Sequence, residues 1–302
     1  MKKISAFLVL LGAICYGAQS SIVKILYDYG LTMWQVLFLE YTLGSIIFLL
    51  YVLVKERKAF FSLTWVEIVK LSLLAILGPG LTSVFYYLAL TYLPASLGVI
   101  FLFQYLLFII LFEKLFNRSV LSLLQVAAVM LIFLGTFLAV DGFSMNVSSF
   151  HWKGAIFGVF SAFTYAIFLF FTDKVSTIST PVVRSTIVAV SIMIAAMLIK
   201  NPIEVFSNIE PSISTFLLLG IIVTLMGQVI PLIAFNIGVP NVGSQLASIL
   251  GAVELPAAII FSSILLAEQI KMTQWFGIIL ITLAIIVSEI KFTLKGKKEK
   301  SR

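Results

Sequence analysis

SILGAVELPAAIIFSSILLAEQI, the segment from Ser248 to Ile270, is apolar or small almost throughout, with Glu254 near its middle. A helix needs about 20 residues to cross the hydrocarbon core of a bilayer, so this length and composition predict a membrane span here. A carboxylate at the bilayer centre is unfavourable, and such residues face the interior of a bundle or a wet cavity. The segment therefore indicates both the class of fold and a candidate functional residue.

The composition of the whole chain points to the same class. Of its 302 residues, 61% are hydrophobic and 11% are charged, and the mean hydropathy is +1.16. Soluble domains carry about 45–50% apolar and about 25% charged residues, so this chain has too little polar sequence to cover a water-exposed surface. Helices satisfy their own backbone groups in lipid, and the apolar runs are too long for barrel strands. We predict an all-α integral membrane protein.

Ten apolar segments are long enough to span a membrane, and short connections join them. The first segment resembles a signal peptide, but its apolar run continues to about Leu26. Ile14 also stands before Cys15, where a lipoprotein cleavage site needs a small residue. We therefore interpret it as a transmembrane helix. The ten predicted spans are 4–26, 33–54, 66–90, 94–113, 119–140, 153–173, 180–199, 213–237, 242–265 and 272–290.

Lysine and arginine residues indicate the orientation of these spans. With the N-terminus in the cytoplasm, 16 of the 20 basic residues fall at inner ends. We therefore expect a multi-pass protein of the cell (cytoplasmic) membrane with both termini in the cytoplasm. The basic tail at 291–302 then anchors the topology, and no nucleic-acid partner is needed to explain it. The four basic residues at outer ends are Lys24, Lys153, Lys200 and Lys271.

The chain repeats itself with a shift of 149 residues, which lays the first five spans on the last five. Because each repeat has an odd number of spans, the two repeats face opposite ways, as is typical of secondary transporters. We predict ten transmembrane helices in a 5+5 inverted-topology repeat. The repeats cover 1–145 and 150–290, and the basic cytoplasmic tail covers 291–302.

Glycine and proline interrupt the third and the eighth span at matching positions. Proline removes a backbone donor, and glycine permits a bend or a close approach. Paired interruptions in corresponding spans indicate a transporter's binding site near the bilayer midplane, whereas a packing kink without a site is the alternative for each. The candidate hinge residues are Gly78, Pro79 and Gly80 in the third span, and Gly227 and Pro231 in the eighth.

Polar residues near the same depth are the candidate substrate-binding residues. We expect a central cavity lined by spans 1, 3, 4, 6, 8 and 9, with Gly80 nearby and spans 5 and 10 at the periphery. For any single tyrosine, the alternative is an interfacial position or a helix–helix hydrogen bond. The candidates are Tyr16, Gln19, Gln104, Tyr105, Tyr165, Gln228, Asn236 and Glu254.

Two carboxylates lie inside predicted spans and are the candidates for proton or cation coupling. Burial in apolar surroundings disfavours the charged form of a carboxyl group. Glu254 is therefore expected either to carry a proton or to anchor a cationic or zwitterionic solute. Glu40 lies in the outer part of the second span. For each residue, a structural hydrogen bond to a neighbouring group is the alternative.

The residue inventory favours a carrier over an enzyme. His151 is the only histidine, Cys15 is the only cysteine, and no G-x-x-x-x-G-K-[ST] phosphate loop occurs. We predict no metal, no cofactor and no enzymatic activity. A channel or an assembly factor is the alternative, although a channel would need a polar ring or a filter segment. The expected partners are a small-molecule substrate and membrane lipid, and a homodimer is compatible with the sequence.

The second half carries a pattern that resembles the drug/metabolite transporter superfamily, in its ten-helix EamA-type branch. In GSQLASILGAVELPAAIIFSSILLAEQIKMTQWFGIILITLAII, a mid-helix Glu254 is followed by Pro256, then by Ala267-Glu268 and Gln274-Trp275. The family's Glu-Pro pair is separated here by Leu255. The resemblance implies a secondary active transporter of small organic solutes such as amino acids or amines, with export as the usual direction in bacteria.

Overall fold

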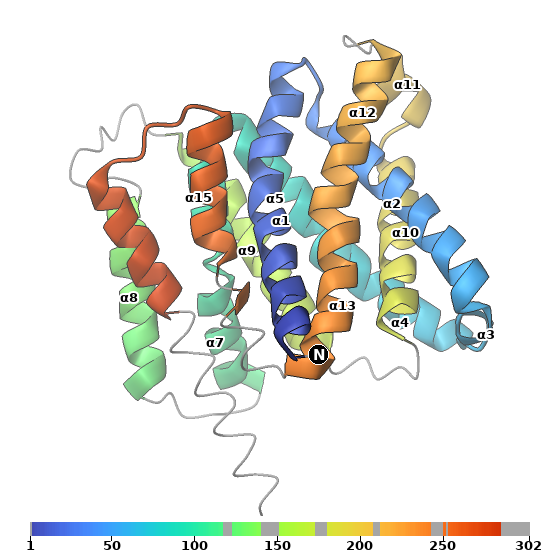
Figure 1. The fold of residues 1–302 in the computed structure, drawn as a ribbon, viewed down its shortest axis with the longest axis horizontal. Helices are drawn as coiled ribbons and strands as arrows, with labels where there is room; N and C mark the ends of the chain where they lie inside the picture. Colours follow the sequence, from blue (N-terminus) through green and yellow to red (C-terminus); the bar gives the residue numbers. More distant parts are fainter. Residues whose placement is uncertain are drawn as a thin grey trace, which may run out of the picture.

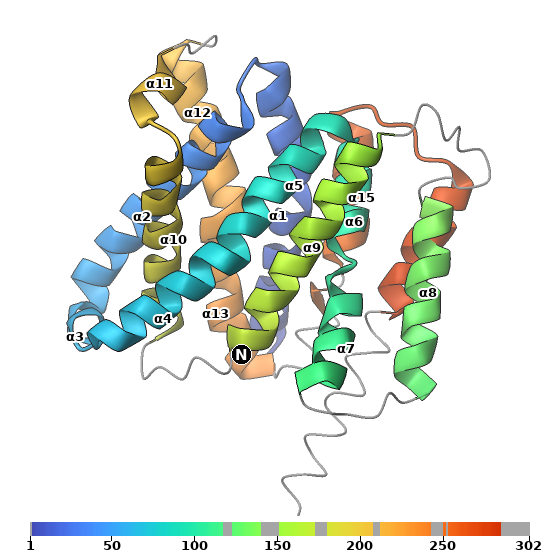
Figure 2. The ribbon, with the colours of Figure 1, turned by 180° about the vertical axis from the view of Figure 1, so that it is seen from behind.

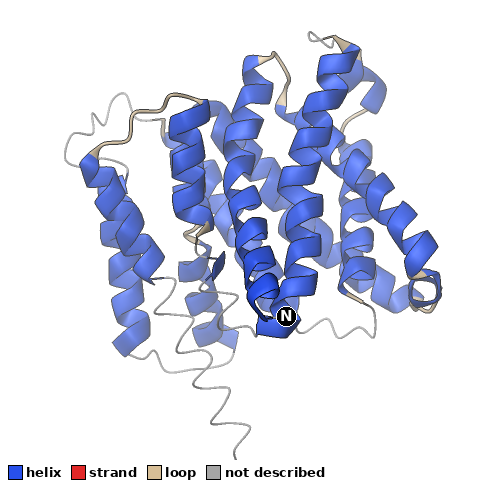
Figure 3. Cartoon of the chain, viewed as in Figure 1, coloured by secondary structure: helices blue, strands red, loops and turns tan. Residues whose placement is uncertain are grey.

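The computed structural model describes residues 2–116, 123–139, 151–172, 180–207, 212–242, 250–251 and 253–284. Every regular element in these residues is a helix (Figure 3). Seven helices are long and apolar enough to cross a membrane, and three shorter apolar helices accompany them at Val126–Ala139, Glu254–Leu265 and Met272–Ala284. The all-helical membrane class predicted from the composition is therefore confirmed.

The helices follow one another with short connections. The first half contains α1 (Lys2–Asp28), α2 (Met33–Lys55), α3 (Arg57–Phe61), α4 (Trp65–Ala75), η1 (Ile76–Gly80), α5 (Leu81–Tyr92), α6 (Ala95–Leu102), α7 (Tyr105–Phe116) and α8 (Leu123–Ala139). The second half contains α9 (Trp152–Thr172), α10 (Pro181–Ile199), α11 (Pro202–Phe206), α12 (Ile213–Thr224), η2 (Leu225–Val229), α13 (Ile230–Val242) and α15 (Glu254–Leu265), before the unlabelled helix at Met272–Ala284. The elements η1 and η2 are π-helical.

Side-chain caps set the starts of α2 and α4. At the start of α2, Thr32 Oγ1 accepts from the backbone N–H of Gln35 at 3.4 Å, and Gln35 Oε1 accepts from the Thr32 N–H at 2.8 Å. Thr64 and Glu67 make the same capping box at the start of α4. Such caps satisfy N–H groups that have no partner within the helix. The sequence therefore fixes locally where these two helices begin.

The two halves of the chain pack into each other (Figures 1 and 2). α1 packs against η2, α13 and α15 of the second half, and α9 packs against η1, α5, α6 and α7 of the first half. Likewise, α2 packs against α12, and α10 packs against α4. α1 and α9 are equivalent under the 149-residue shift, as are α2 and α10. The contacts are therefore reciprocal, and both halves enclose the centre of the bundle.

α8 and the helix at Met272–Ala284 form a pair at one side of the bundle (Figure 1). Their backbones touch, because a Cβ on Gly277 would stand 2.4 Å from the carbonyl oxygen of Gly135. Gln274 Nε2 also donates to the carbonyl oxygen of Ala139 at 2.9 Å. Small residues permit such close helix approaches in a membrane. These helices therefore stabilise each other away from the centre.

Basic residues lie mainly at one end of the bundle. The N-terminus, α3, the C-terminal end of α7 and the start of α10 share this end, whereas α11 and the connection from α1 to α2 lie at the opposite end (Figure 1). The described basic residues at the N-terminal end include Lys55, Arg57, Lys58, Lys114 and Arg184. The charge asymmetry seen in the sequence thus corresponds to two physical ends of the bundle.

Candidate functional site

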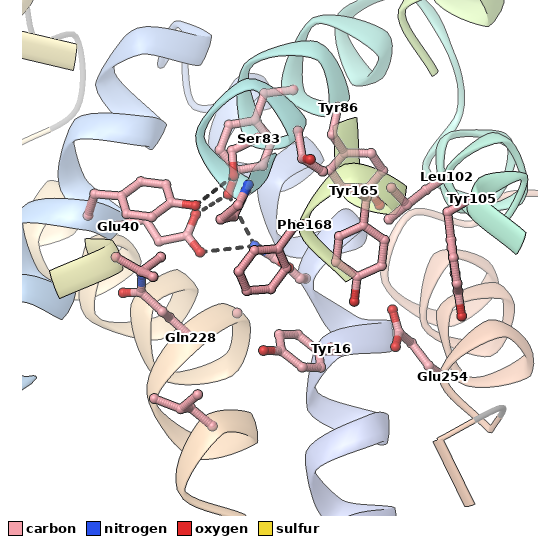
Figure 4. Close-up of a pocket in the computed structure, with 18 of the residues that line it drawn as sticks. Tyr16, Glu40, Ser83, Tyr86, Leu102, Tyr105, Tyr165, Phe168, Gln228 and Glu254 are labelled. Atoms are coloured by element: carbon pink, nitrogen blue, oxygen red, sulfur yellow. Dashed lines mark hydrogen bonds between the residues drawn. The ribbon is translucent and has the colours of Figure 1, made fainter. Parts of the chain in front are cut away.

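A cavity of about 260 Å³ lies at the centre of the bundle, between the two halves (Figure 4). Its lining comes from α1, α2, α5, α6, α7, α9, α10, α13 and α15, and from both π-helical segments. Within the described ranges, neither α8 nor the helix at Met272–Ala284 contributes a lining residue. The cavity is therefore enclosed by the helices through which the two halves pack against each other.

The cavity wall includes two helices that the sequence prediction left out. Glu40, Tyr41 and Phe48 come from α2, and Ser185 and Val188 come from α10. α2 and α10 pack against each other and close one side of the cavity. Spans 1, 3, 4, 6, 8 and 9 all contribute lining residues as expected, and spans 2 and 7 add to them, so the expected lining was incomplete.

Glu40 is held inside a hydrogen-bond network at one end of the cavity. Gln19 Nε2 donates to Glu40 Oε1 at 3.0 Å, and the hydroxyl of Tyr87 donates to Glu40 Oε2. The same Gln19 nitrogen lies 3.1 Å from the Tyr87 hydroxyl oxygen. Glu40 is 2% exposed and Tyr87 is 1% exposed. Each carboxyl oxygen thus has a donor, which is the condition under which a buried acid is tolerated. Tyr87 was not among the predicted site residues.

Glu254 stands at the other end of the cavity in different surroundings. It lines the cavity, and among the described residues its carboxyl group has no hydrogen-bond partner. The carboxyl group and the hydroxyl of Tyr165 point toward each other, and the ring of Tyr16 lies between Glu254 and Gln228 (Figure 4). Glu254 is therefore the carboxyl group that remains available to a ligand.

Aromatic rings surround the space next to Glu254. The rings of Tyr105 and Tyr165 meet edge to face, with centroids 5.1 Å apart and an interplanar angle of 86°. The ring of Tyr16 stacks on Phe235 at 5.9 Å. Such contacts fix ring positions and leave apolar faces toward the cavity. This end of the site combines one acid with aromatic walls.

The two interruptions predicted from glycine and proline are π-helical segments at equivalent positions. η1 (Ile76–Gly80) and η2 (Leu225–Val229) are related by the same shift of 149 residues, so Gly78 corresponds to Gly227. Gly78 has non-helical angles of φ −93° and ψ −105°. π-Helical segments lengthen a turn and often occur at functional sites. Pro79 of η1 and Gly227 and Gln228 of η2 also line the cavity.

A second pair of breaks lies in the fourth and ninth spans. α6 ends at Leu102 and α7 begins at Tyr105, while α15 begins at Glu254 after a turn at Val253. Tyr105 and Glu254 are equivalent under the 149-residue shift. No proline or glycine marks Phe103 or Gln104, so composition gave no signal for the first of these breaks. Glu254 is therefore the first residue of a helix and not the centre of a continuous one.

Five predicted residues lie outside the cavity lining, or cannot be placed there. Gln104 Nε2 donates to the carbonyl oxygen of Ile100 at 3.2 Å and to Thr136 Oγ1 at 2.7 Å. Its amide faces α8 and not the cavity, so it is removed from the candidate binding residues. Gly78, Gly80 and Pro231 are buried outside the lining. Asn236 belongs to α13, and its side chain lies outside the described part of the structure.

Polar contacts tie helices together at the end of the bundle that holds α11. Lys24 Nζ donates to the backbone carbonyl oxygen of Leu90 at 3.0 Å, and the hydroxyl of Tyr27 donates to the backbone carbonyl oxygen of Tyr87 at 2.9 Å. Glu268 Oε1 accepts from the Ala95 N–H at 2.7 Å, so the carboxyl group caps the start of α6. A carboxylate at a helix N-terminus is stabilising. These contacts join α1 to α5, and the start of α6 to the connection that follows α15.

A second cavity of about 290 Å³ adjoins the first. The two share Phe168, Ser185 and Val188, and the second also contains Arg184 near the start of α10. This second cavity lies toward the end of the bundle where α10 begins. Within the described ranges, no group of three or more His, Cys, Asp or Glu side chains could hold a metal ion.

The chain matches a known family in both halves. The model of the EamA-like transporter family matches residues 3–140 and again residues 152–289. No curated protein matches the chain. Twenty-two chains of solved structures match it. One, described only as "Crystal structure of protein", is 17% identical with a TM-score of 0.62 over 95% of this chain and 97% of that chain. At this identity the likeness concerns the fold alone.

Proposed function

The chain belongs to the EamA-like transporter family, and we propose that it is a secondary active transporter of a small organic solute. The solute would be an amino acid, an amine or a related metabolite, exported across the cytoplasmic membrane. The observation that carries the proposal is the central cavity, which both halves enclose beside paired helix breaks. Binding sites of secondary transporters lie at such interfaces between repeats.

The proposal includes ten spans in a 5+5 inverted repeat, with repeats at 1–145 and 150–290. The reciprocal packing of α1 and α9, and of α2 and α10, supports it. The two family matches begin at residues 3 and 152, and the difference equals the shift found from the sequence. η1 and η2 obey the same shift. An odd number of spans in each repeat would then invert one repeat relative to the other.

Both termini are proposed to lie in the cytoplasm, because the N-terminal end of the bundle carries most of the described basic residues. Two serines at the ends of short helices offer a matched test. Ser62 follows α3 and Ser207 follows α11, and both are exposed at opposite ends of the bundle. In a Cys15→Ala background, an impermeant thiol reagent should label Ser207→Cys in intact cells and leave Ser62→Cys unlabelled. The reverse pattern would overturn the orientation.

The proposed mechanism is alternating access around a fixed central site. The two halves would rock against each other, with the backbone adjusting at η1 and η2. Glu254 would bind the solute or a proton, because its carboxyl group faces the cavity without a partner among the described residues. A single carboxyl group that binds either a proton or a cationic solute would couple transport of the solute to transport of the proton. Glu40 is the second candidate for coupling.

A counterflow experiment tests this function. Purified protein in proteoliposomes would be loaded with unlabelled solute, taken from a thermal-shift screen of amines and amino acids. Labelled solute would then be added outside at low concentration. A carrier accumulates label transiently by exchange without an ion gradient, and the proposal predicts this result. Equilibration without a transient overshoot would indicate a channel, and no flux with any stabilising solute would contradict the transport function.

A further inference from the structure

The charged groups that line the central cavity are all acidic. In the described lining, Glu40 and Glu254 are present and lysine, arginine and histidine are absent. We propose that the cavity selects organic cations, namely small amines with an aromatic or aliphatic body, over zwitterions and anions. This inference rests on the proposed transport function and narrows its substrate class.

Glu254 is the group that would bind the cation. Both oxygens of Glu40 already accept hydrogen bonds, from Gln19 and from Tyr87. Glu254 accepts none from the described residues, although it lines the same cavity. A carboxyl group away from bulk water is unfavourable when ionised and unpaired. An ammonium group of the solute would supply the donor and the opposite charge together.

The aromatic walls beside Glu254 favour the same class of solute. Tyr16, Tyr105 and Tyr165 surround the carboxyl group, and the Tyr105 and Tyr165 rings are held edge to face at 5.1 Å. A cation near the face of an aromatic ring is attracted by its quadrupole, more strongly when water is excluded. An apolar body attached to the amine would pack against the same rings. The carboxyl group would therefore bind the ammonium group of the solute, and the tyrosine rings would bind its apolar body.

A solute carboxylate would find no comparable partner. It could accept hydrogen bonds from tyrosine hydroxyls or from the Gln228 amide, but it would lose water without meeting an opposite charge in the described lining. Arg184 lines the adjoining cavity and not the central one. A zwitterion that used Arg184 would have to extend past Phe168 and Ser185, which the two cavities share. The alternative to be tested is therefore a zwitterion whose carboxylate pairs with Arg184.

The size of the cavity limits the body of the amine. Its volume of about 260 Å³ lies just below the range of about 300–1,000 Å³ that holds drug-sized ligands. The occupant is therefore expected to be a small amine of roughly one-ring size. Four probes share one ring and differ in charge, namely phenethylamine (cation), phenylalanine (zwitterion), 3-phenylpropionate (anion) and 2-phenylethanol (neutral).

Titration calorimetry of the four probes with the purified full-length protein at pH 7 tests the inference. The wild-type protein gives the first comparison, and two variants give the second. Phenethylamine should bind at least about tenfold more tightly than each of the others, because it alone brings an ammonium group to Glu254 without burying a carboxylate that has no opposite charge in the described lining. Glu254→Gln should weaken phenethylamine binding by at least about tenfold. Glu204→Gln, which removes an exposed carboxyl group on α11, should leave binding unchanged.

Several outcomes would overturn the inference. These are equal or tighter binding of phenylalanine or 3-phenylpropionate, no binding of any probe, and an affinity for phenethylamine that Glu254→Gln does not change. Phenylalanine binding that Arg184→Gln abolishes would assign the site to zwitterions. Counterflow with labelled phenethylamine separates the proposed transport function from the proposed preference for cations. Binding without exchange would contradict transport and leave the cation preference standing, whereas exchange of phenylalanine alone would support transport and overturn the preference.

Discussion

Glu40 from the first half and Glu254 from the second half line one cavity, but they are not equivalent in the repeat. Under the 149-residue shift, Glu40 corresponds to Ala189 and Glu254 corresponds to Tyr105. The backbones behave differently from the side chains, because η1 and η2 occupy equivalent positions in the two halves. The halves thus share their backbone breaks and differ in the polar groups that they place beside them.

This difference suggests a division of roles. Equivalent breaks allow the two halves to bend in the same way, which alternating access requires. The carboxyl group of Glu40 has donors on both oxygens, whereas that of Glu254 has none among the described residues. We therefore assign Glu40 to stability of the fold and Glu254 to binding. The predictions below test this contrast.

The largest expected effect on stability belongs to Glu40→Leu. The substitution would leave the Gln19 amide and the Tyr87 hydroxyl buried without their acceptor. Each unsatisfied group costs about 1–3 kcal/mol, so loss of the acceptor for both should lower the free energy of unfolding by about 2–6 kcal/mol. Reversible unfolding in mixed micelles would measure it, with exposed Glu204→Leu as the control. A loss no greater than that of the control would show that Glu40 does not hold the bundle together.

The next effect compares the two π-helical segments. A Cβ on Gly78 would stand 2.7 Å from the Cβ and 3.2 Å from the Cα of Phe168, whereas a Cβ on Gly227 would meet only the Gln19 side chain. Backbone atoms cannot move aside, so Gly78→Ala should destabilise the fold by about 1–3 kcal/mol. Gly227→Ala should cost less, because a side chain can shift where backbone atoms cannot, and its cost is the weakened bond from Gln19 to Glu40. Equal losses in the same unfolding assay would contradict this difference between the halves.

Two tyrosines at opposite ends of the cavity should respond differently to loss of their hydroxyls. Tyr87→Phe removes a donor to Glu40 and should reduce the free energy of unfolding by about 1–2 kcal/mol. Tyr165→Phe should stay within about 0.5 kcal/mol of the wild type in stability and weaken solute binding, since its hydroxyl points toward Glu254. Unfolding and calorimetric titration of both variants would check this. A loss of stability in Tyr165→Phe, together with a loss of solute binding in Tyr87→Phe, would assign binding to the Glu40 end of the cavity and stability to the Glu254 end.

The smallest effect is expected from Gly44→Ala. A Cβ at this position would stand 1.7 Å from Gln228 Oε1, a buried atom with no hydrogen-bond partner among the described residues. Since Gln228 has a flexible side chain beside the cavity, its amide can rotate away, and the stability loss should be below about 1 kcal/mol. Solute affinity should fall less than in Glu254→Gln, by calorimetry. A larger loss of stability would mean that Gln228 cannot move.

Much of the fold could be predicted from the sequence, because apolar length and charge placement have direct physical causes. The breaks at Gly78 and Gly227 were also predictable, since glycine and proline weaken a helix locally. The break before Tyr105 was not, because Phe103 and Gln104 carry no such signal. The tertiary contacts that stabilise this turn are absent from any local pattern.

The site was predictable only in part, because hydrophobicity does not tell which face of an apolar helix is inward. Gln104 was predicted to line the cavity, yet its amide donates a hydrogen bond to Thr136 of α8. Tyr87 was passed over, although it is the donor to Glu40. The cap that Glu268 makes on α6 had no sequence signal, because it depends on the packing of two segments far apart in the chain. Charged residues inside a span were the stronger signal, because lipid excludes them.

The most direct measurement is gradient-driven transport by Glu254→Gln and Glu40→Gln, assayed side by side with their unfolding in the same detergent. Glutamine keeps the shape of each side chain and removes its ionisation. The account predicts that Glu254→Gln folds with wild-type stability and loses uphill transport, whereas Glu40→Gln loses stability. Retained exchange in Glu254→Gln would point to proton coupling, and loss of exchange would point to solute binding. Wild-type uphill transport by Glu254→Gln would contradict the central claim and shift the functional role to Glu40.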